Sequence, residues 1–328
     1  MDTNDTAPVC VTGANGYVGS WVTKALLDRG LTVHATVRDP NNARKFAHLQ
    51  KSADASEGTL RVFRGDLLEP GSFDAALEGC SVLFHTASPF FISGIKDAKK
   101  QLVDPALEGT KGALESATRA GSVKRVVLTS SVAAIYGDNA DMADRGLSQF
   151  TEEHWNESSS LSHQPYSYSK TLAEREAWRL AKDAQWQLVA INPAVILGPS
   201  VDPQASSTSI RTMRDMIDGT SAAGVADLTF GLVDVRDVAD AHLDAAFQPN
   251  VEGRFITVSG CHSMLEIAEL LRDEFGTSLA LAKRVLPKWL VWLVAPTRGV
   301  PRGFISRNVG YRLDFDTGRL RDTLGITP

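Results

Sequence analysis

Three glycines near the start of the chain constrain its fold more than any other feature. They are Gly13, Gly16 and Gly19, spaced G-x-x-G-x-x-G, and they follow four residues of strand character that begin at Val9. An amphipathic helical pattern comes next, with Gly30 as its end. The first glycine permits a tight turn, the second lets backbone N–H groups approach a pyrophosphate, and the third lets the helix pack close to the sheet. Since helix N-termini attract anions, this context favours a dinucleotide-binding turn over an ordinary one.

The bulk composition narrows the class of protein. With 328 residues, 43% of them hydrophobic, the chain can bury a sizeable core in one large domain or one domain with a lobe. A net charge of −5 argues against a general nucleic-acid surface. Its three cysteines are too few and too scattered for a disulfide framework or a zinc site, so we expect no metal and a reducing, cytoplasmic location.

Membrane and export signals are weak. The polar residues 1–7 lack the apolar core of a signal peptide. The most apolar run, Trp289–Ala295, is shorter than the roughly 20 residues that span a bilayer. We interpret this run as a buried helix or a wall of a substrate lobe, with a membrane-leaning or partner surface as the alternative.

Strand and helix patterns alternate over the first two-thirds of the chain, which predicts a parallel sheet covered on both faces. The fold class we expect is α/β, a Rossmann-type doubly wound parallel sheet with a smaller C-terminal substrate lobe. We predict further strands over 31–37, 60–63, 82–87, 126–131 and 188–192, and a helix over 99–120. Residues 233–240 should lead into a helix around 241–247, and 254–258 should form a late strand. The expected organisation is a cofactor domain over 1–195, rejoined by 232–258, and a substrate lobe formed by 196–231 and 259–328.

A second diagnostic stretch contains Tyr166 and Lys170, four residues apart at the start of a predicted helix and therefore on one face. A lysine ammonium one turn away would lower the pKa of the tyrosine and suit it to proton transfer. Tyr168 has no lysine at the matching distance. At the end of the fifth strand, Ser130 and Ser131 are both candidates to hold a substrate oxygen.

Taken together, these motifs resemble those of the extended short-chain dehydrogenases/reductases. Among them, the chain is similar to the branch of dihydroflavonol reductases, cinnamoyl-CoA reductases and aldehyde (methylglyoxal) reductases. Matching phrases are Thr36–Pro40, Phe84–Phe90, Ser169–Glu174, Asn192–Pro193 and Val233–Ala239. The resemblance implies a catalytic triad of Ser131, Tyr166 and Lys170, nicotinamide contacts from Pro193 to Val195, and adenine contacts from Asp66 and Leu67.

The charge after the second strand favours NADPH over NADH as the cofactor. Arg38 stands where readers of NAD usually carry an acidic residue, and Lys45 follows within reach of a 2′-phosphate. Asp39 is interpreted as a turn former before Pro40. The residues expected to contact the cofactor are Gly13, Asn15, Gly16, Tyr17, Val18, Gly19, Arg38, Lys45, Asp66, Leu67, Thr86, Ala87, Ser88, Thr129, Tyr166, Lys170, Pro193, Ala194 and Val195.

The expected reaction is hydride transfer to an aldehyde or ketone, with Tyr166 as the general acid, Ser131 orienting the carbonyl and Lys170 assisting the tyrosine. The expected substrate is a mostly apolar small molecule. The residues expected to contact it are Ser88, Phe90, Tyr136, Met213 and Phe230, and Phe91 and Met216 are further apolar candidates.

Alternative activities stay open. The segment Gln164-Pro165-Tyr166 departs from the cinnamoyl-CoA reductase pattern, and Tyr136 replaces the asparagine of dihydroflavonol reductases. The alternatives are a 3β-hydroxysteroid dehydrogenase or a dihydroflavonol reductase, followed by a nucleotide-sugar epimerase or dehydratase and a non-catalytic NADP sensor. We expect a monomer or homodimer with no nucleic-acid partner and no membrane span.

Overall fold

The computed structural model describes residues 7–88, 97–202, 213–214 and 217–328 of the chain. The substrate candidates Phe90, Phe91 and Met216 lie outside these ranges.

Within the described residues, seven parallel strands form the main sheet in the order β3-β2-β1-β4-β5-β6-β9. Its strands are β1 (Val9–Thr12), β2 (Thr32–Val37), β3 (Thr59–Arg64), β4 (Val82–His85), β5 (Arg125–Thr129), β6 (Gln187–Pro193) and β9 (Gly253–Thr257). The predicted α/β doubly wound fold is confirmed.

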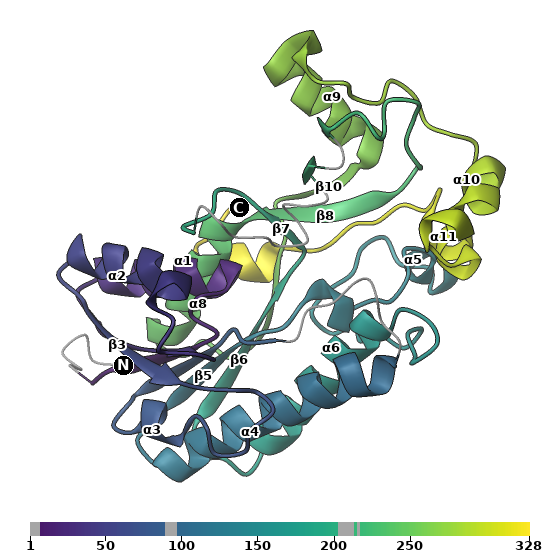
Figure 1. Cartoon of the computed structure of the whole chain (residues 1–328). Coiled ribbons are helices and arrows are strands. Elements are labelled where there is room, and N and C mark those ends of the chain that lie inside the picture. The colour runs from purple at the N-terminus through teal and green to yellow at the C-terminus, as the bar shows by residue number, and fades with distance from the viewer. Residues whose placement is uncertain (1–6, 89–96, 203–212, 215–216) are drawn as a thin grey trace.

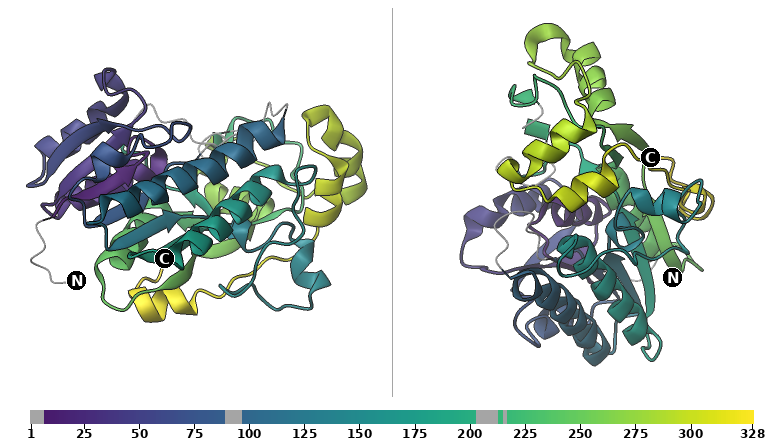
Figure 2. Two further views of the ribbon diagram at one scale, coloured as in Figure 1. Left: turned by 90° about the horizontal axis from the view of Figure 1, so that it is seen from below. Right: turned by 90° about the vertical axis from the view of Figure 1, so that its right-hand side faces the viewer.

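Helices cover both faces of this sheet (Figure 1). One layer contains α1 (Tyr17–Asp28), α2 (Ala47–Asp54) and α8 (Val235–Phe247). The opposite layer contains α3 (Asp74–Leu77), α4 (Asp104–Ala120) and α6 (Pro165–Ala181), with the long α4 and α6 side by side (Figure 2). Apolar side chains of the strands alternate between two buried cores, one under each layer.

A smaller sheet lies beside the carboxyl ends of the main strands. It joins β7 (Val195–Leu197) in parallel to β8 (Thr229–Asp234), and β8 antiparallel to β10 (Gly260–Ser263). Three helices follow, α9 (Met264–Phe275), α10 (Lys288–Val294) and α11 (Arg302–Asn308), while α5 (Ala140–Asp144) lies near α11 (Figure 1). Ligands of open parallel sheets bind beyond the carboxyl ends of the strands, so this edge is where a site is expected.

One predicted helix boundary is wrong. The helix expected around 241–247 begins six residues earlier, at Val235. Asp234 caps it, because its carboxylate accepts a hydrogen bond from the backbone N–H of Arg236 at 2.8 Å. The helix expected over 99–120 is present as a helical turn over Lys99–Val103 that leads into α4.

Candidate active site

The glycine turn is packed so closely that side chains are excluded from it. Gly13 has a φ of +64°, and a Cβ there would lie 2.9 Å from the Cα of Ala87. A Cβ on Gly19 would collide with the carbonyl oxygen of Gly13 and lie 2.8 Å from Thr86 Oγ1. The Thr86 hydroxyl donates to the carbonyl of Thr12 at 2.7 Å, which fixes the end of β4 against the turn. The turn after β1, the end of β4 and the start of α1 lie so close together that positions 13 and 19 require glycine.

The N-terminus of α1 remains available for an anion. Gly16 caps it without any side-chain hydrogen bond, and a Cβ on Gly16 would approach only the Gly13 carbonyl oxygen, at 3.1 Å. Its first residues, Tyr17 and Val18, are half-buried. Tyr17 donates its hydroxyl hydrogen to the carbonyl of Gly198 at 2.8 Å, and burial raises its pKa to about 12. Exposed backbone N–H groups at such an end fit a pyrophosphate.

Three cations surround the edge of this turn. Arg38 directly follows β2, and Arg44 and Lys45 lie on the next helical turn; all three are exposed. The Asn15 amide donates to the carbonyl of Lys45 at 3.5 Å, so the glycine turn and the cations are adjacent. Asp39 accepts from the N–H of Asn41 at 3.1 Å, as a turn former does. Arg44 is a third cation that the sequence analysis passed over, although it stands beside Lys45.

The third strand is followed by Asp66 and Leu67. Asp66 Oδ1 accepts from the N–H of Leu68 at 2.9 Å, which shapes the turn. Leu67 packs on α4 at Gly109, where a Cβ would lie 2.7 Å from the leucine Cδ2. Both residues are half-buried at the carboxyl edge of the sheet.

The structure brings Ser131, Tyr166 and Lys170 together. Ser131 follows β5, and its hydroxyl accepts from the N–H of Ala133 at 3.1 Å and donates to the carbonyl of Pro193 at 3.4 Å. Ser131 also hydrogen-bonds the Tyr166 phenol. Tyr166 and Lys170 lie one turn apart in α6, with Tyr166 half-buried and Lys170 buried. The end of β5 and the first turns of α6 therefore place Ser131, Tyr166 and Lys170 in one cluster.

The electrostatics of this cluster differ from the expectation. Burial raises the pKa of Tyr166 above its ordinary value, and the hydrogen bond with Ser131 opposes that shift. The net shift is upward because burial is its largest cause. Burial lowers the pKa of Lys170 to about 8, and the Glu174 carboxylate opposes that change. At neutral pH the phenol is thus protonated, and most of the lysine carries its charge.

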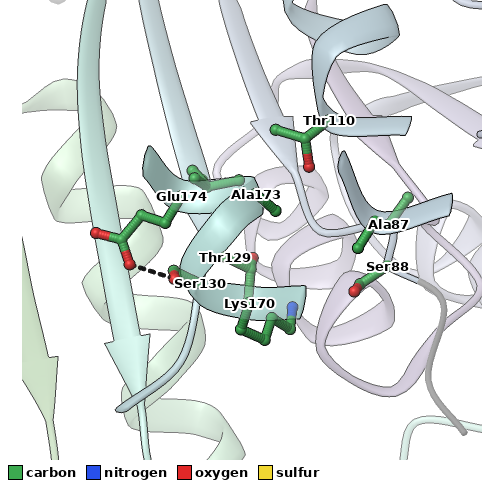
Figure 3. Close-up of a pocket in the computed structure, with 10 residues that line it drawn as sticks. Ala87, Ser88, Thr110, Thr129, Ser130, Lys170, Ala173 and Glu174 are labelled. Atoms are coloured by element: carbon green, nitrogen blue, oxygen red, sulfur yellow. Dashed lines mark hydrogen bonds between the residues drawn. The ribbon is translucent and has the colours of Figure 1, made fainter. Parts of the chain in front are cut away.

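A cavity of about 10 Å³, room for roughly one water molecule, lies beside Lys170. It is lined by the ends of β4 and β5 and by residues of α4 and α6. In Figure 3 the Lys170 ammonium faces Ser88 and Ala87, whereas Glu174 points the other way, toward Ser130. Thr129 also lines the cavity, and its hydroxyl donates to His242 Nε2 at 2.6 Å.

A buried ion pair supports α6 from behind, and the sequence analysis missed it. Glu174 is fully buried and pairs with Arg254 of β9 at 2.6 Å. The same carboxylate accepts hydrogen bonds from the Ser130 hydroxyl and from the Asn192 amide, the latter at 2.8 Å. Asn192 also donates to the carbonyl of Ser131 at 3.1 Å. This network holds the ends of β5 and β6 against the helix that carries Tyr166.

A second buried carboxylate anchors the start of α6. Asp138 accepts from Arg307 at 2.8 Å, His163 at 2.7 Å and Gln164 at 3.0 Å. Gln164, the residue before α6, has a φ of +55°, which is uncommon outside glycine. Its hydrogen bonds maintain this backbone conformation two residues before Tyr166.

Several other predicted contacts lie at the carboxyl edge of β6. Pro193 and Ala194 are buried and Val195 is half-buried. The N–H of Ala194 donates to the carbonyl of Thr257 at 3.2 Å, so the turn is braced by β9.

The substrate candidates are only partly brought together. Tyr136 stacks on Phe150 with ring centroids 5.2 Å apart, and Phe315 packs on its edge at 5.6 Å. Half-buried Phe230 lies on β8, beside Gly231, whose Cβ would come within 3.1 Å of Phe315. Met213 is half-buried, and in this part of the chain the structure describes only Met213 and Arg214. In the parts of the chain that the structure describes, no three His, Cys, Asp or Glu side chains form a metal-binding group.

Sequence comparisons identify the family. Residues 9–258 match the NAD dependent epimerase/dehydratase family. The chain is 42% identical to cinnamoyl-CoA reductase CAD2 of Medicago truncatula, across 81% of this chain and 80% of that one. It is 32% identical to dihydroflavonol 4-reductase of Gerbera hybrida, across 84% and 74% of the two chains.

A solved structure is similar over nearly the whole length. It is yeast methylglyoxal/isovaleraldehyde reductase Gre2 complexed with NADPH, with a TM-score of 0.77 and 27% identity, and the alignment covers 97% of this chain and 93% of that one. The predicted resemblance is confirmed: this chain belongs to the NAD dependent epimerase/dehydratase family, the extended short-chain dehydrogenases/reductases.

Proposed function

We propose that the protein reduces an aldehyde or ketone to an alcohol with NADPH. The observation that carries this proposal is the hydrogen bond between Ser131 and Tyr166, with Lys170 one turn farther along α6. The named relatives and the structural neighbour are reductases, and the latter was solved with NADPH, which supports the same activity.

The cofactor would lie across the carboxyl edge of the sheet. The uncapped N-terminus of α1 fits its pyrophosphate, and a 2′-phosphate would meet Arg38, Arg44 and Lys45. When bound, NADPH supplies a hydride to the carbonyl carbon of the substrate. We further propose that 1–195 and 232–258 form the cofactor domain, and that 196–231 and 259–328 form the substrate lobe.

The side chains of Ser131, Tyr166 and Lys170 would orient the substrate carbonyl and transfer a proton to it. Tyr166 is protonated at neutral pH, since the ordinary pKa of tyrosine is about 10 and burial raises it further, so it can donate its hydroxyl proton to the carbonyl oxygen. Ser131 orients that oxygen through its hydroxyl. The ammonium of Lys170 stabilises the phenolate that Tyr166 becomes after it has donated the proton.

The substrate would be a mostly apolar carbonyl compound. The aromatic side chain of Tyr136, which packs on Phe315, supports an apolar lining close in sequence to Ser131, and Phe230 of β8 is a further candidate. The similarity to a dihydroflavonol 4-reductase supports a flavonoid ketone as the alternative to a simple aldehyde or ketone.

Absorbance of the reduced nicotinamide tests this function. NADPH and NADH are compared with aromatic aldehydes, aliphatic ketones, a steroid and a dihydroflavonol, and faster loss of NADPH is expected. Replacing Tyr166 with Phe should reduce turnover by at least about 100-fold, the lower end of general-acid contributions, while NADPH still binds. Tyr168→Phe, two residues later in the same helix, is the matched control and should keep activity. Equal turnover in the two variants would refute the role of Tyr166.

A further inference from the structure

The helix α10 presents an apolar stripe to solvent. Trp289, Trp292 and Leu293 follow the i, i+3, i+4 spacing of one helix face and are 68%, 39% and 54% exposed. Such contiguous exposed aromatic and aliphatic residues on a folded protein mark an interaction surface.

The opposite side of α10 is already packed. Val291 and the following Ala295 contact Ile305 and Val309 around α11, together with Ala226. This packing does not involve the tryptophans. Figures 1 and 2 show α10 and α11 at an outer end of the molecule, away from the main sheet.

The segment around this stripe is strongly basic. Residues 283–312 contain no Asp or Glu, although the whole chain has a net charge of −5. The cations of this segment are Lys283, Arg284, Lys288, Arg298, Arg302, Arg307 and Arg312. Within the described residues, the ion pairs of this segment involve only Arg307 and Arg312. The other five cations leave this segment of the chain with an excess of positive charge.

One of these cations is held against the stripe. The Arg302 guanidinium lies 4.3 Å from the ring centroid of Trp292. Lys288, at the start of α10, donates to the carbonyls of Ser306 and Val309 at 3.0 and 2.7 Å. Arg302 and the indole ring of Trp292 thus share one surface, whereas the Lys288 ammonium is bound at the end of α11.

We propose that this surface, named here the α10 patch and consisting of the exposed stripe of α10 with Arg298 and Arg302, docks on an anionic lipid bilayer. Tryptophans favour the interface between headgroups and acyl chains, and basic residues around them attract anionic headgroups. Among the described residues, no helix has the length and apolar character to cross a bilayer, so α10 would lie in the plane of the interface. A symmetric contact between two copies would bring the same cations face to face, which disfavours a second copy as the occupant.

Vesicle flotation tests the proposal without an activity readout. The probes are vesicles of phosphatidylcholine with 30% phosphatidylserine, and vesicles of phosphatidylcholine alone, each at 0.05 and 0.5 M NaCl. The wild-type chain should float with the anionic vesicles at low salt, and at least tenfold less of it with neutral vesicles or at high salt. The W289S/W292S variant should lose at least tenfold in binding, and W289F/W292F should retain it.

Leu68→Ser is the matched control, because Leu68 is 67% exposed on a distant loop after β3. This variant should bind anionic vesicles like the wild type. Quenching of wild-type tryptophan fluorescence by brominated lipid is a second measurement that needs no variant. Absence of binding and quenching with anionic vesicles would overturn the proposal, as would equal binding by W289S/W292S and the wild type. A dimer in sedimentation velocity that W289S/W292S converts to monomer, with no vesicle binding, would instead assign the patch to contacts between copies.

Discussion

Removing the guanidinium of Arg254 should destabilise the fold strongly. Arg254→Met keeps most of the side-chain volume but deletes the ion pair to Glu174, which is fully buried, and hydrogen bonds to the carbonyls of Glu152 and His154 at 2.8 and 2.6 Å. Breaking a buried pair by removing one partner costs about 3–5 kcal/mol, because the remaining charge is left without compensation. Unfolding entropy of roughly 2.1 cal/mol/K per residue gives about 0.7 kcal/mol/K for this chain, so Tm should fall by about 4–7 °C.

Differential scanning calorimetry measures this shift, and a surface pair provides the control. Arg119→Met deletes an ion pair to Asp74 in which the two side chains are 49% and 48% exposed. Exposed pairs contribute about 0–1 kcal/mol, so Tm should fall by no more than about 1.5 °C.

A double-mutant cycle measures the interaction between Glu174 and Arg254 separately from the other contacts of the two side chains. Glu174→Gln should also destabilise the protein, because Arg254 is then buried without its counter-ion. The double variant carries neither charge, so its loss should be smaller than the sum of the two single losses by about 1–3 kcal/mol. Strict additivity, or a shift for Arg254→Met no larger than that of Arg119→Met, would refute the reasoning that this pair is coupled.

Three further variants have defined outcomes. Gly19→Ala should weaken NADPH binding at least tenfold by fluorescence titration, since its Cβ meets the Gly13 carbonyl, whereas Gly112→Ala has open space and should bind normally. Burial lowers the pKa of His242 to about 4, so between about pH 6.5 and pH 4 the unfolded chain binds a proton that the native state does not. The stability that neutral His242 contributes is therefore fully present above about pH 6.5 and is lost as the pH falls toward 4. The free energy of unfolding falls by up to about 1.4 kcal/mol per pH unit in this range. His242→Gln should therefore flatten the acid limb of a urea-stability profile, and an unchanged slope would contradict this. Glu174→Gln removes the charge that raises the pKa of Lys170, so the basic limb of kcat/KM against pH should move to lower pH; a limb that stays in place or moves up would contradict the assignment.

The fold and the common helix face of Tyr166 and Lys170 were readable from sequence because their signals are local, whereas the choice of Ser131 over Ser130 came from the family resemblance. Gly13, Gly16 and Gly19 lie within one turn and its helix, and Tyr166 and Lys170 are one helical turn apart, so periodicity alone places them. The parallel order of strands then brings Ser131, at the end of β5, toward α6.

The supporting carboxylates could not be predicted, because their partners are distant in sequence. Glu174 meets Arg254 across 80 residues, and Asp138 meets Arg307 across 169. In the sequence Glu174 resembles any acidic residue of an exposed helix face. Only the parallel pairing of β9 with β6 brings Arg254 next to it. The start of α8 was missed for a different reason, since the capping role of Asp234 is local but was not recognised.

The two carboxylates together explain how the C-terminal third of the chain can influence chemistry on α6. Arg307 of α11 binds Asp138, and Asp138 binds Gln164 at the start of α6, so the orientation of Tyr166 depends on a residue of α11. Farther along the same helix, Glu174 connects to β9 and to the strand ends that carry Ser131. Helix α6 is therefore fixed at two points by groups outside its own sequence region. Substitutions in α11 should consequently change turnover more than cofactor affinity, because the glycine turn lies on the other elements of the sheet.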